Sequence, residues 1–586
     1  MNPARSGARR PLKWLLPLAA CVVVAALALL LVFSGIASPF LSSWTGEEDP
    51  REQIKGVGAW LWLRLQHGAP ETAPYTPMPH TGLNPFGINT FLEQEVEPAK
   101  VELSMQMISA AGFRWIRQEF PWEDIEISGK GDYWDHKWDQ SAWAKYDRIV
   151  DLAERNGLRI IARLDNPPAW SRAAGDEAGT LAPPDRLEDF GDYVHAVVSR
   201  YRGRVRYYQI WNEPNIYPEW GEQPVDARAY VELLKVAYTR AKEADPDCVI
   251  LSAGLAQTAE TGPRNLDDTI YLQQMYDAGV QGYFDIMGVM AYGLWTGPGD
   301  QRLSQDRTNF SRPQLIREIM VRNGDADKPI WATEIGWNAL PTDFAGPANF
   351  GRVTQPKQAR YAVQAYERAQ RDWPWMGVMN FWFFKRATDQ ETSQTFYYFR
   401  MVEPDFTPLP VYEAMRDYAN RAPMVPIGYH QEDHWALSYG GEWVDLDDAQ
   451  AVLGRLRQAQ GQATLAFTFR GTDLELVTRQ GPESGSLAVR LDGRALPTIS
   501  LKAAQPLHQQ RITLAQGLRD GAHTVELACL GDGPVAIDGL IVRRTARYWQ
   551  RVLGQSAALI GAAVVGLAGL AWLGRRRRSG AGSRHD

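Results

Sequence analysis

The run Tyr207-Tyr208-Gln209-Ile210-Trp211-Asn212-Glu213-Pro214 decides both the fold and the chemistry expected of this chain. Its aromatic and β-branched residues predict a buried strand, and proline ends that strand directly after a carboxylate. The stretch 329–338, Pro-Ile-Trp-Ala-Thr-Glu-Ile-Gly-Trp-Asn, carries Glu334 out of a second apolar strand in the same way. Two glutamates at strand ends suit the cleavage of a glycoside. That reaction needs one carboxylic acid to protonate the leaving oxygen and one carboxylate to attack or to activate water.

Short apolar runs alternate with longer amphipathic runs across residues 86–423, which is typical of βα units and a parallel sheet. Eight strands are predicted, at 86–90, 113–120, 159–165, 207–213, 248–254, 285–293, 329–337 and 376–384. The predicted helices include 100–111, 143–156, 187–201, 227–244, 313–322, 358–370 and 410–419. Eight such units predict a (β/α)8 TIM barrel of the α/β class, with catalytic residues at the C-terminal ends of the strands. An open doubly wound sheet is the alternative, but no glycine-rich phosphate loop follows the first strand.

Residues 424–545 change to short alternating strands. Asp-Gly pairs at 492–493, 520–521 and 532–533 indicate hairpin turns between them. This pattern predicts an all-β, jelly-roll-like sandwich. Its last strand, 535–542, resembles the closing strand of galactose-binding-like sandwiches. Two roles stay open for this domain: binding of carbohydrate, or service as a passive spacer.

Two apolar segments, 14–36 and 552–574, are each long enough to span a hydrocarbon core of about 30 Å. Four basic residues precede the first segment within 1–13, and four arginines at 575–578 follow the second. The positive-inside rule therefore puts 1–13 and 575–586 in the cytoplasm. It puts the barrel and the sandwich on the extracellular side of the plasma membrane.

Two other interpretations of the first apolar segment were weighed. A cleaved signal peptide usually has a shorter apolar region of about 7–15 residues, and the cleavage signal near Ala37 is poor. Lipidation of Cys21 is disfavoured because twelve more apolar residues follow it. Residues 37–85 are predicted to be a juxtamembrane linker whose proline-rich end acts as a spacer. The Trp-rich piece at 60–63 either lies at the membrane interface or packs on the barrel.

The composition is that of a globular protein whose partners are not polyanions. The 586 residues are 45% hydrophobic and 22% charged, and the net charge of −7 gives no reason to expect nucleic acid. Besides Cys21 only Cys248 and Cys529 occur, so no disulfide framework is expected. His430 and His434 are four residues apart without a further ligand candidate nearby. The sequence therefore predicts no metal and implies no cofactor.

With these motifs in place, residues 86–420 resemble the glycoside hydrolases of clan A, in particular the family 39 β-xylosidase and α-L-iduronidase group. The Trp-Asn-Glu-Pro run at 211–214 is the specific part of this resemblance. The resemblance implies a retaining hydrolase of carbohydrate in which Glu213 is the acid/base and Glu334 the nucleophile. It further implies substrate contacts from Asn212, at the sugar 2-hydroxyl, and from Arg117, Tyr292 and Trp382.

Physical reasons accompany these roles. A cation such as Arg117 and a hydroxyl such as that of Tyr292 would favour the ionised form of Glu334. For Arg117 a buried ion pair with Glu119 or Glu123 is an equal alternative. Glu213 must be protonated first and ionised later, which requires apolar surroundings and the negative charge of its partner.

Further candidates come from the predicted ends of strands and from loops. Asp165 and Asn166 end a strand and are candidates for the −1 subsite. Two or three of the tryptophans in loops on the catalytic face are expected to stack on sugar, although tryptophan is more often part of a core. These are Trp122, Trp170, Trp220, Trp295 and Trp337. Many clan members carry a histidine near the ends of strands three and six, but this chain has none between His195 and His430. The sugar that it recognises therefore stays open.

Two other functions share these features. One is a non-catalytic surface protein that uses the barrel and the sandwich to hold a glycan, since a fold alone does not prove activity. The other is a transglycosidase, which shares the covalent step and differs in whether sugar or water resolves it. Retention of both carboxylates with Asn212 and Tyr292 favours an enzyme over a binder.

Overall fold

The computed structural model describes residues 33–545. Within this part of the chain no helix is both long enough and apolar enough to cross a membrane. The predicted spans at 14–36 and 552–574 lie outside the described residues, apart from 33–36. Both spans therefore stay predictions.

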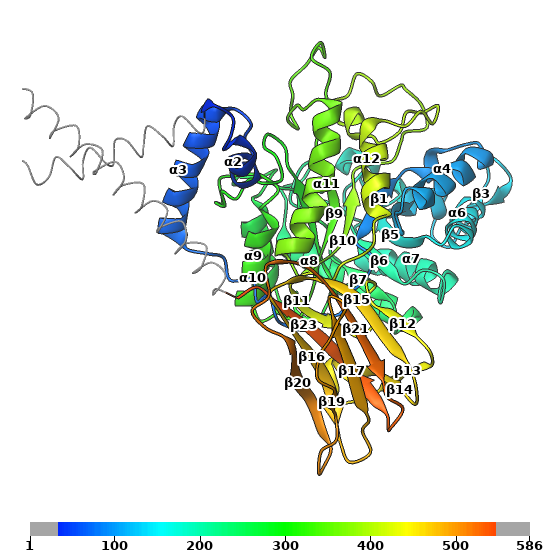
Figure 1. Cartoon of the computed structure of the whole chain (residues 1–586). Coiled ribbons are helices and arrows are strands. Elements are labelled where there is room, and N and C mark those ends of the chain that lie inside the picture. The colour runs from blue at the N-terminus through cyan, green and yellow to red at the C-terminus, as the bar shows by residue number, and fades with distance from the viewer. Residues whose placement is uncertain (1–32, 546–586) are drawn as a thin grey trace, which may run out of the picture.

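Eight parallel strands form the predicted barrel (Figure 1). Their order in the sheet is β7-β6-β5-β2-β1-β10-β9-β8, and two parallel bridges, Leu251 to Ile286 and Leu255 to Val289, join β7 to β8. The strands are β1 (Phe86–Thr90), β2 (Trp115–Pro121), β5 (Arg159–Asp165), β6 (Tyr207–Ile210), β7 (Val249–Leu251), β8 (Met287–Tyr292), β9 (Ile330–Gly336) and β10 (Met376–Phe381). Most of these strands are buried along their whole length because helices cover the outside and side chains fill the inside.

A helix follows each strand of the barrel. These helices are α4 (Pro98–Ala110), α6 (Ala144–Arg155), α7 (Leu187–Arg200), α8 (Ala227–Ala244), α9 (Asp268–Asp277), α10 (Pro313–Arg322), α11 (Gln355–Asp372) and α12 (Pro410–Ala419). α9 was not among the predicted helices. Its N-cap Asp267 accepts hydrogen bonds from the amides of Thr269 and Ile270, which satisfies donors of the first turn.

Aromatic rings close the N-terminal end of the barrel. The indole of Trp115, in β2, lies 5.0 Å from the ring of Tyr207, in β6, and 5.2 Å from the indole of Trp331, in β9. The indole nitrogens of Trp115 and Trp331 donate to the carbonyl oxygens of Asn84 and His80 at 2.8 and 3.1 Å. The segment 78–85, which was predicted to be part of a spacer, therefore crosses this end of the barrel and is held there.

The rest of the segment 37–85, which was predicted to be a juxtamembrane linker, contains two helices. It forms α2 (Ser38–Thr45) and α3 (Pro50–His67), which pack beside the barrel (Figure 1). Arg302 of the barrel donates to the Thr45 carbonyl oxygen at 3.0 Å and pairs with Glu47 at 2.6 Å and with the fully buried Asp300 at 2.8 Å. The buried charge of Arg302 thus gains partners from both sides of this contact.

The second domain is the predicted β-sandwich. One sheet has the order β11-β23-β16-β20, another β12-β15-β21-β17-β18, and a third β13-β14-β22. Their bounds are β11 (Gly428–Gln431), β12 (Ser438–Gly440), β13 (Trp443–Asp447), β14 (Arg455–Ala459), β15 (Thr464–Gly471), β16 (Asp473–Gln480), β17 (Ser486–Leu491), β18 (Arg494–Ala495), β20 (Leu507–Ala515), β21 (Gly521–Cys529), β22 (Val535–Ile537) and β23 (Gly539–Arg543). Apolar side chains from these strands, including Leu465, Leu476 and Leu540, form a separate core.

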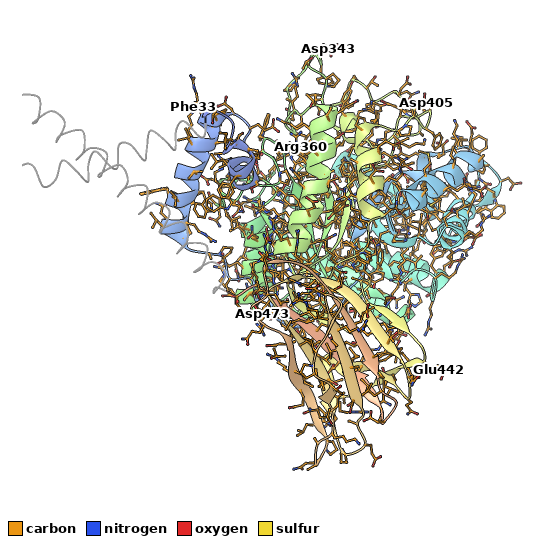
Figure 2. All side chains as sticks on the ribbon, in the orientation of Figure 1. Phe33, Asp343, Arg360, Asp405, Glu442 and Asp473 are labelled. Atoms are coloured by element: carbon orange, nitrogen blue, oxygen red, sulfur yellow. The ribbon has the colours of Figure 1, made fainter. Side chains whose placement is uncertain are left out.

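The sandwich packs against the N-terminal end of the barrel. The amide of Trp435 donates to the Gly82 carbonyl oxygen at 2.7 Å, and its indole meets the ring of Phe86 at 6.2 Å. Asp343 and Asp405, which follow the C-terminal ends of β9 and β10, lie at the opposite end of the molecule from Glu442 and Asp473 of the sandwich (Figure 2). The sandwich therefore does not border the end of the barrel where the two glutamates are expected.

Two buried histidines, His430 and His434, lie beside this interface with ring centroids 4.8 Å apart. Burial lowers the pKa of His430 to about 4 and that of His434 well below its usual range. Below pH ~6.5 these histidines bind protons in the unfolded chain but stay neutral in the folded chain. The free energy of unfolding should therefore fall as pH falls toward 4. For His430 this loss is about 3 kcal/mol.

The measurement is denaturant unfolding between pH 7 and 4 for the wild type and for His430→Gln/His434→Asn. Gln and Asn can replace the hydrogen bonds to the Pro426 carbonyl oxygen and from the Ala436 amide, but they do not titrate. The variant should lose less stability across this range than the wild type. Parallel curves for the two proteins would refute the assignment.

Candidate active site

Glu213 lies directly beyond β6, in a turn with strained backbone. Trp211 has a φ of 71° and Glu213 a φ of 39°, both in the left-handed region that non-glycine residues seldom adopt. Each costs on the order of 1–3 kcal/mol and persists only when the surroundings fix it. This turn is why β6 ends at Ile210 and not at Glu213 as predicted.

Hydrogen bonds hold the turn in place. The Glu213 amide donates to the Gly254 carbonyl oxygen at 3.1 Å. The buried side chain of Asn215 donates to the carbonyl oxygens of Ala256 and Leu266 at 2.9 Å and accepts from the Ala256 amide at 2.8 Å. The turn is thereby tied to the segments that follow β7, which fixes the direction in which Glu213 leaves the strand.

Gly254 is needed for this arrangement. A Cβ atom at this position would lie 2.1 Å from the hydroxyl oxygen of Thr333, which is much closer than two such atoms can approach. Thr333 precedes Glu334 in β9 and donates to the Val289 carbonyl oxygen at 3.0 Å. The absence of a side chain at Gly254 therefore lets the turn that carries Glu213 approach the strand that carries Glu334.

Glu334 is buried within β9 and has two partners. Its Oε1 accepts a hydrogen bond from Nη1 of Arg117 at 2.9 Å, and its Oε2 accepts one from the Tyr292 hydroxyl. The side chains of Arg117 and Glu334 are only 2% and 6% exposed, so water screens this ion pair little. Of the two alternatives for Arg117, the structure has the pair with Glu334 and not one with Glu119 or Glu123.

Arg117 has three further acceptors. Its guanidinium donates to the side-chain oxygens of Asn89 at 2.7 Å, Gln209 at 2.7 Å and Asn212 at 2.8 Å. Asn89 in turn donates to the Thr333 carbonyl oxygen at 3.0 Å. The fork of Arg117 therefore connects residues of β1, β6 and β9, and it fixes the orientation of the Asn212 amide.

The two glutamates, Glu213 and Glu334, differ in the charges and hydrogen-bond donors that surround them. Burial raises the pKa of Glu213 well above its ordinary value, and the negative charge of Glu334 raises it further. Burial and the charge of Glu334 also raise the pKa of Tyr292, so its phenol stays a hydrogen-bond donor. Glu334 has a cation and a donor beside it, whereas Glu213 is held in its protonated form. The two carboxyl groups therefore have unlike surroundings.

Glu219 is a site residue that the sequence analysis missed. Its backbone oxygen accepts a hydrogen bond from the Trp211 indole at 2.8 Å, and its carboxylate accepts one from the Asn212 side chain. Burial raises the pKa of Glu219 to about 7. No motif marks this residue, because its approach depends on the chain folding back between 213 and 219.

A second buried cation, Arg163, organises the neighbouring carboxylates. It pairs with Glu119 at 2.7 Å and with Asp165 at 2.9 Å, and the Asn166 amide donates to Glu119 at 2.7 Å. Burial raises the pKa of Asp165 to about 8, although the charge of Arg163 opposes the shift. Asp165 and Asn166 therefore lie at the barrel mouth as expected. Arg163 was missed, because a single arginine within an apolar strand gives little signal.

The predicted aromatic contacts are only partly available to a substrate. Trp337 is fully buried, with its indole nitrogen donating to the Thr296 carbonyl oxygen at 2.8 Å, so its predicted place among the sugar contacts is wrong. Trp122 and Trp220 are also buried in the core. Trp382 is partly exposed and lies 5.4 Å from the ring of Phe91. The sequence placed these tryptophans in loops at the catalytic face, but the rings of Trp122, Trp220 and Trp337 are buried in the core.

Within residues 33–545 no group of three or more His, Cys, Asp or Glu side chains is placed to hold a metal ion.

Comparisons with known proteins agree with this architecture. Residues 74–338 match the sequence model of the cellulases, glycosyl hydrolase family 5. The match includes Arg117, Glu213 and Glu334 and supports the resemblance to the glycoside hydrolases of clan A. No curated protein matches the chain.

Solved structures of glycosidases are also similar to this chain. A family 39 glycoside hydrolase from the gut symbiont Bacteroides cellulosilyticus is 19% identical, with 81% of this chain and 83% of that one covered at a TM-score of 0.44. A monomeric β-xylosidase from Caulobacter crescentus is 14% identical, with coverages of 78% and 98% and a TM-score of 0.42. A family 39 enzyme from Xanthomonas axonopodis is 15% identical, with coverages of 79% and 95% and a TM-score of 0.40.

The ion pair between Arg117 and Glu334 can be tested by a double-mutant cycle. Arg117→Met leaves Glu334 as an uncompensated buried charge, which should cost ~3–5 kcal/mol of stability. Combining it with Glu334→Met removes both charges and should restore most of that loss. The measurement is denaturant unfolding of the wild type, both single variants and the double variant. A coupling energy near zero would contradict the pair.

Proposed function

We propose that this protein is a membrane-tethered retaining glycoside hydrolase that acts on extracellular oligo- or polysaccharide. The observation that carries the proposal is the pair of unlike glutamates. Glu334 is bound by Arg117 and Tyr292, and Glu213 has a raised pKa that depends partly on the charge of Glu334. A protein that only bound glycan would have no need for this difference.

In the first step, Glu213 donates its proton to the glycosidic oxygen while an Oε atom of Glu334 attacks the anomeric carbon. The bond from that carbon to the leaving oxygen breaks, and an ester bond between the sugar and Glu334 forms. Arg117 and Tyr292 hold the attacking carboxylate in position. Asn212, which Arg117 orients, is available for the sugar 2-hydroxyl.

In the second step, water replaces the leaving group. Formation of the ester removes the negative charge of Glu334, which is one cause of the raised pKa of Glu213. The pKa of Glu213 therefore falls once the intermediate has formed, and its carboxylate accepts a proton from the attacking water. The ester bond breaks, and the sugar leaves with its original anomeric configuration.

The roles of the glutamates predict different variant behaviour. Glu334→Ala should abolish hydrolysis of every substrate because no covalent intermediate can form. Glu213→Ala should retain more activity on aryl glycosides with good leaving groups, which need little protonation, and azide should restore turnover by attacking the intermediate. The measurement is steady-state kinetics on a series of aryl glycosides with increasing leaving-group pKa.

Three outcomes would contradict these roles: an inverted first product in time-resolved NMR, equal losses for Glu213→Ala across the leaving-group series, or no response to azide. Glu219→Gln is a matched control, since Glu219 is a neighbouring carboxyl with a raised pKa but no assigned proton transfer. It should show no azide rescue. A screen that adds sugar acceptors in place of water separates hydrolysis from transglycosylation.

Tethering rests on the two apolar segments, 14–36 and 552–574, and on the basic residues beyond each of them. We infer that both termini are cytoplasmic and that the barrel and the sandwich face outward from the plasma membrane. Protease added to intact cells should therefore remove the folded domains and leave both segments in the membrane. Complete protection of the domains in intact cells, with cleavage after lysis, would reverse this orientation.

A further inference from the structure

We propose that the outer face of α2 and α3 lies on the lipid bilayer and holds the barrel against it in one orientation. This inference rests on the proposed tether and goes beyond it. A tether alone would leave the folded domains free to swing about a flexible linker. An interfacial helix pair that is fixed to the barrel would instead set which side of the enzyme faces the membrane.

Large apolar side chains are concentrated on this face. Between Phe33 and Leu65, seven large hydrophobic residues are at least 38% exposed, out of nineteen such residues in 33–545. On α3, Ile54, Leu61 and Leu65 follow one another at helical spacing, and Leu65 is 82% exposed. A patch of this kind marks an interaction surface in a soluble domain.

The opposite face of these helices is attached to the barrel. Gln53 of α3 is fully buried and donates to the Glu47 carbonyl oxygen at 3.0 Å, and Trp60 packs on Trp44 of α2 with centroids 4.5 Å apart. Glu48 accepts hydrogen bonds from Arg360 and, at 3.2 Å, from Tyr361 of α11. Together with the buried Arg302, these contacts fix the pair to the barrel.

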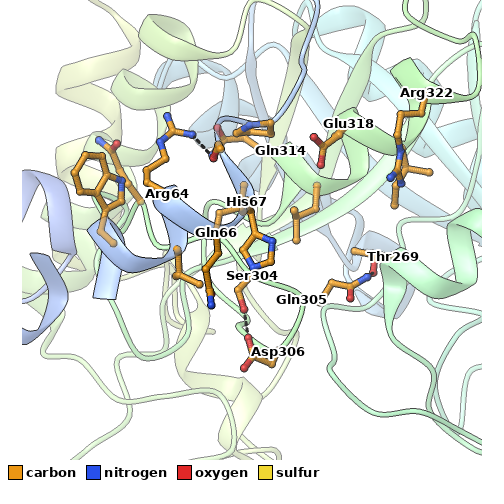
Figure 3. A pocket seen from close by; sticks show the side chains of 18 of the residues that line it. Arg64, Gln66, His67, Thr269, Ser304, Gln305, Asp306, Gln314, Glu318 and Arg322 are labelled. Carbon is orange, nitrogen blue, oxygen red and sulfur yellow. Dashed lines mark hydrogen bonds between the residues drawn. The ribbon is translucent and has the colours of Figure 1, made fainter. Parts of the chain in front are cut away.

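The C-terminal half of α3 is held less closely. A cavity of about 570 Å³ separates it from α10, and Arg64 and His67 lie across this cavity from Glu318 and Arg322 (Figure 3). This half of α3 carries the most exposed residues, including Trp62 at 61%. Leu61, Trp62 and Leu65 are exposed, whereas Trp60 and Leu63 line the cavity on the barrel side, and no described residue packs over the exposed three.

The preceding chain points to the bilayer as the occupant. The uncharged run 14–33 ends only five residues before α2 begins at Ser38. At no more than ~3.6 Å per residue, such a connection keeps α2 close to the surface that the span crosses. Arg51 and Lys55 are exposed along α3, and cations of this kind are attracted to anionic headgroups. Trp62 also suits a membrane interface.

This placement determines how the active site faces the membrane. α3 lies beside the barrel and not across either end, with the mouth loops at one end and the sandwich at the other (Figure 1). A bilayer against α3 therefore runs past the side of the barrel. The mouth opens along the membrane surface, which suits a glycan chain lying in the layer next to the membrane.

The test uses the full chain in nanodiscs of phosphatidylethanolamine and phosphatidylglycerol. A spin label is placed at Leu65→Cys, with Val96→Cys as the matched control and Cys21→Ser in both. Val96 is 89% exposed and precedes α4, which lies on the far side of the barrel from α3 (Figure 1). The remaining cysteines, Cys248 and Cys529, are buried. The ratio of collisions with oxygen to collisions with a water-soluble nickel chelate should be several-fold higher at 65 than at 96.

Equal ratios at the two positions would overturn the proposal. Shielding of position 65 from both reagents would also overturn it, because protein would then cover the face. Spin–spin broadening would identify that protein as a second copy, and its absence would favour the segment 552–574 of the same chain. Flotation with vesicles tests the tether separately. If the chain floats but the label at 65 collides mainly with the water-soluble nickel chelate, the tether holds and the contact of α3 with the bilayer does not.

Discussion

The buried guanidinium of Arg117 is the constraint on which the catalytic end of the barrel depends. Its desolvation is costly and lowers its own pKa, although the charge of Glu334 opposes that shift. The cost is offset by hydrogen bonds to the guanidinium. Four of these go to Glu334, Asn89, Gln209 and Asn212, which come from β9, β1, β6 and the turn after β6. The same contacts that satisfy this cation therefore fix the positions of the groups around the reaction centre.

The two ends of the barrel differ in packing and in the backbone conformations that they contain. At the N-terminal end, rings such as Trp115 and Trp331 pack together, and the backbone at 78–85 covers them. At the C-terminal end the chain tolerates left-handed backbone at Trp211 and Glu213 and buried carboxylates with raised pKa values. Packing of the sandwich beneath the first end supports the barrel without blocking the second. The sandwich therefore lies away from the end that carries Glu213 and Glu334.

The sequence was sufficient for the barrel and for its two glutamates. β1 and β5 begin and end at the predicted residues, because apolar periodicity and turn residues are local signals. Trp337 was misjudged because its position after a strand does not reveal which way the ring turns, and burial governs that choice. Glu219 was missed because its approach to Asn212 depends on a turn of the chain that no local pattern marks.

The segment 37–85 shows a second limit of sequence reasoning. Its proline-rich end suggested a spacer, yet α2 and α3 are anchored by single buried contacts such as Arg302 with Glu47. Such contacts leave no periodic trace in either partner. In the Trp-rich piece at 60–63, Trp60 packs inward against Trp44, whereas Trp62 is exposed. One face of this helix is therefore packed against protein, and the placement of the other face at a membrane interface stays a proposal.

The carboxylates near the centre are best understood as one titrating group. Asp165, with a pKa of about 8, and Glu219, with a pKa of about 7, both lie near Arg163, while Glu334 also raises the pKa of Glu219. Of the two, Glu219 acts on Glu213: a proton taken up by Glu219 as pH falls reduces the negative charge that Glu213 experiences, so the proton of Glu213 is released more easily. As pH rises through about 7, Glu219 ionises and the proton on Glu213 is held more tightly. In the proposed mechanism, a more tightly held proton keeps Glu213 loaded as the acid of the first step but opposes its action as the base of the second. Loss of the Glu334 charge in the proposed ester intermediate would then lower the pKa of Glu213 when a base is needed.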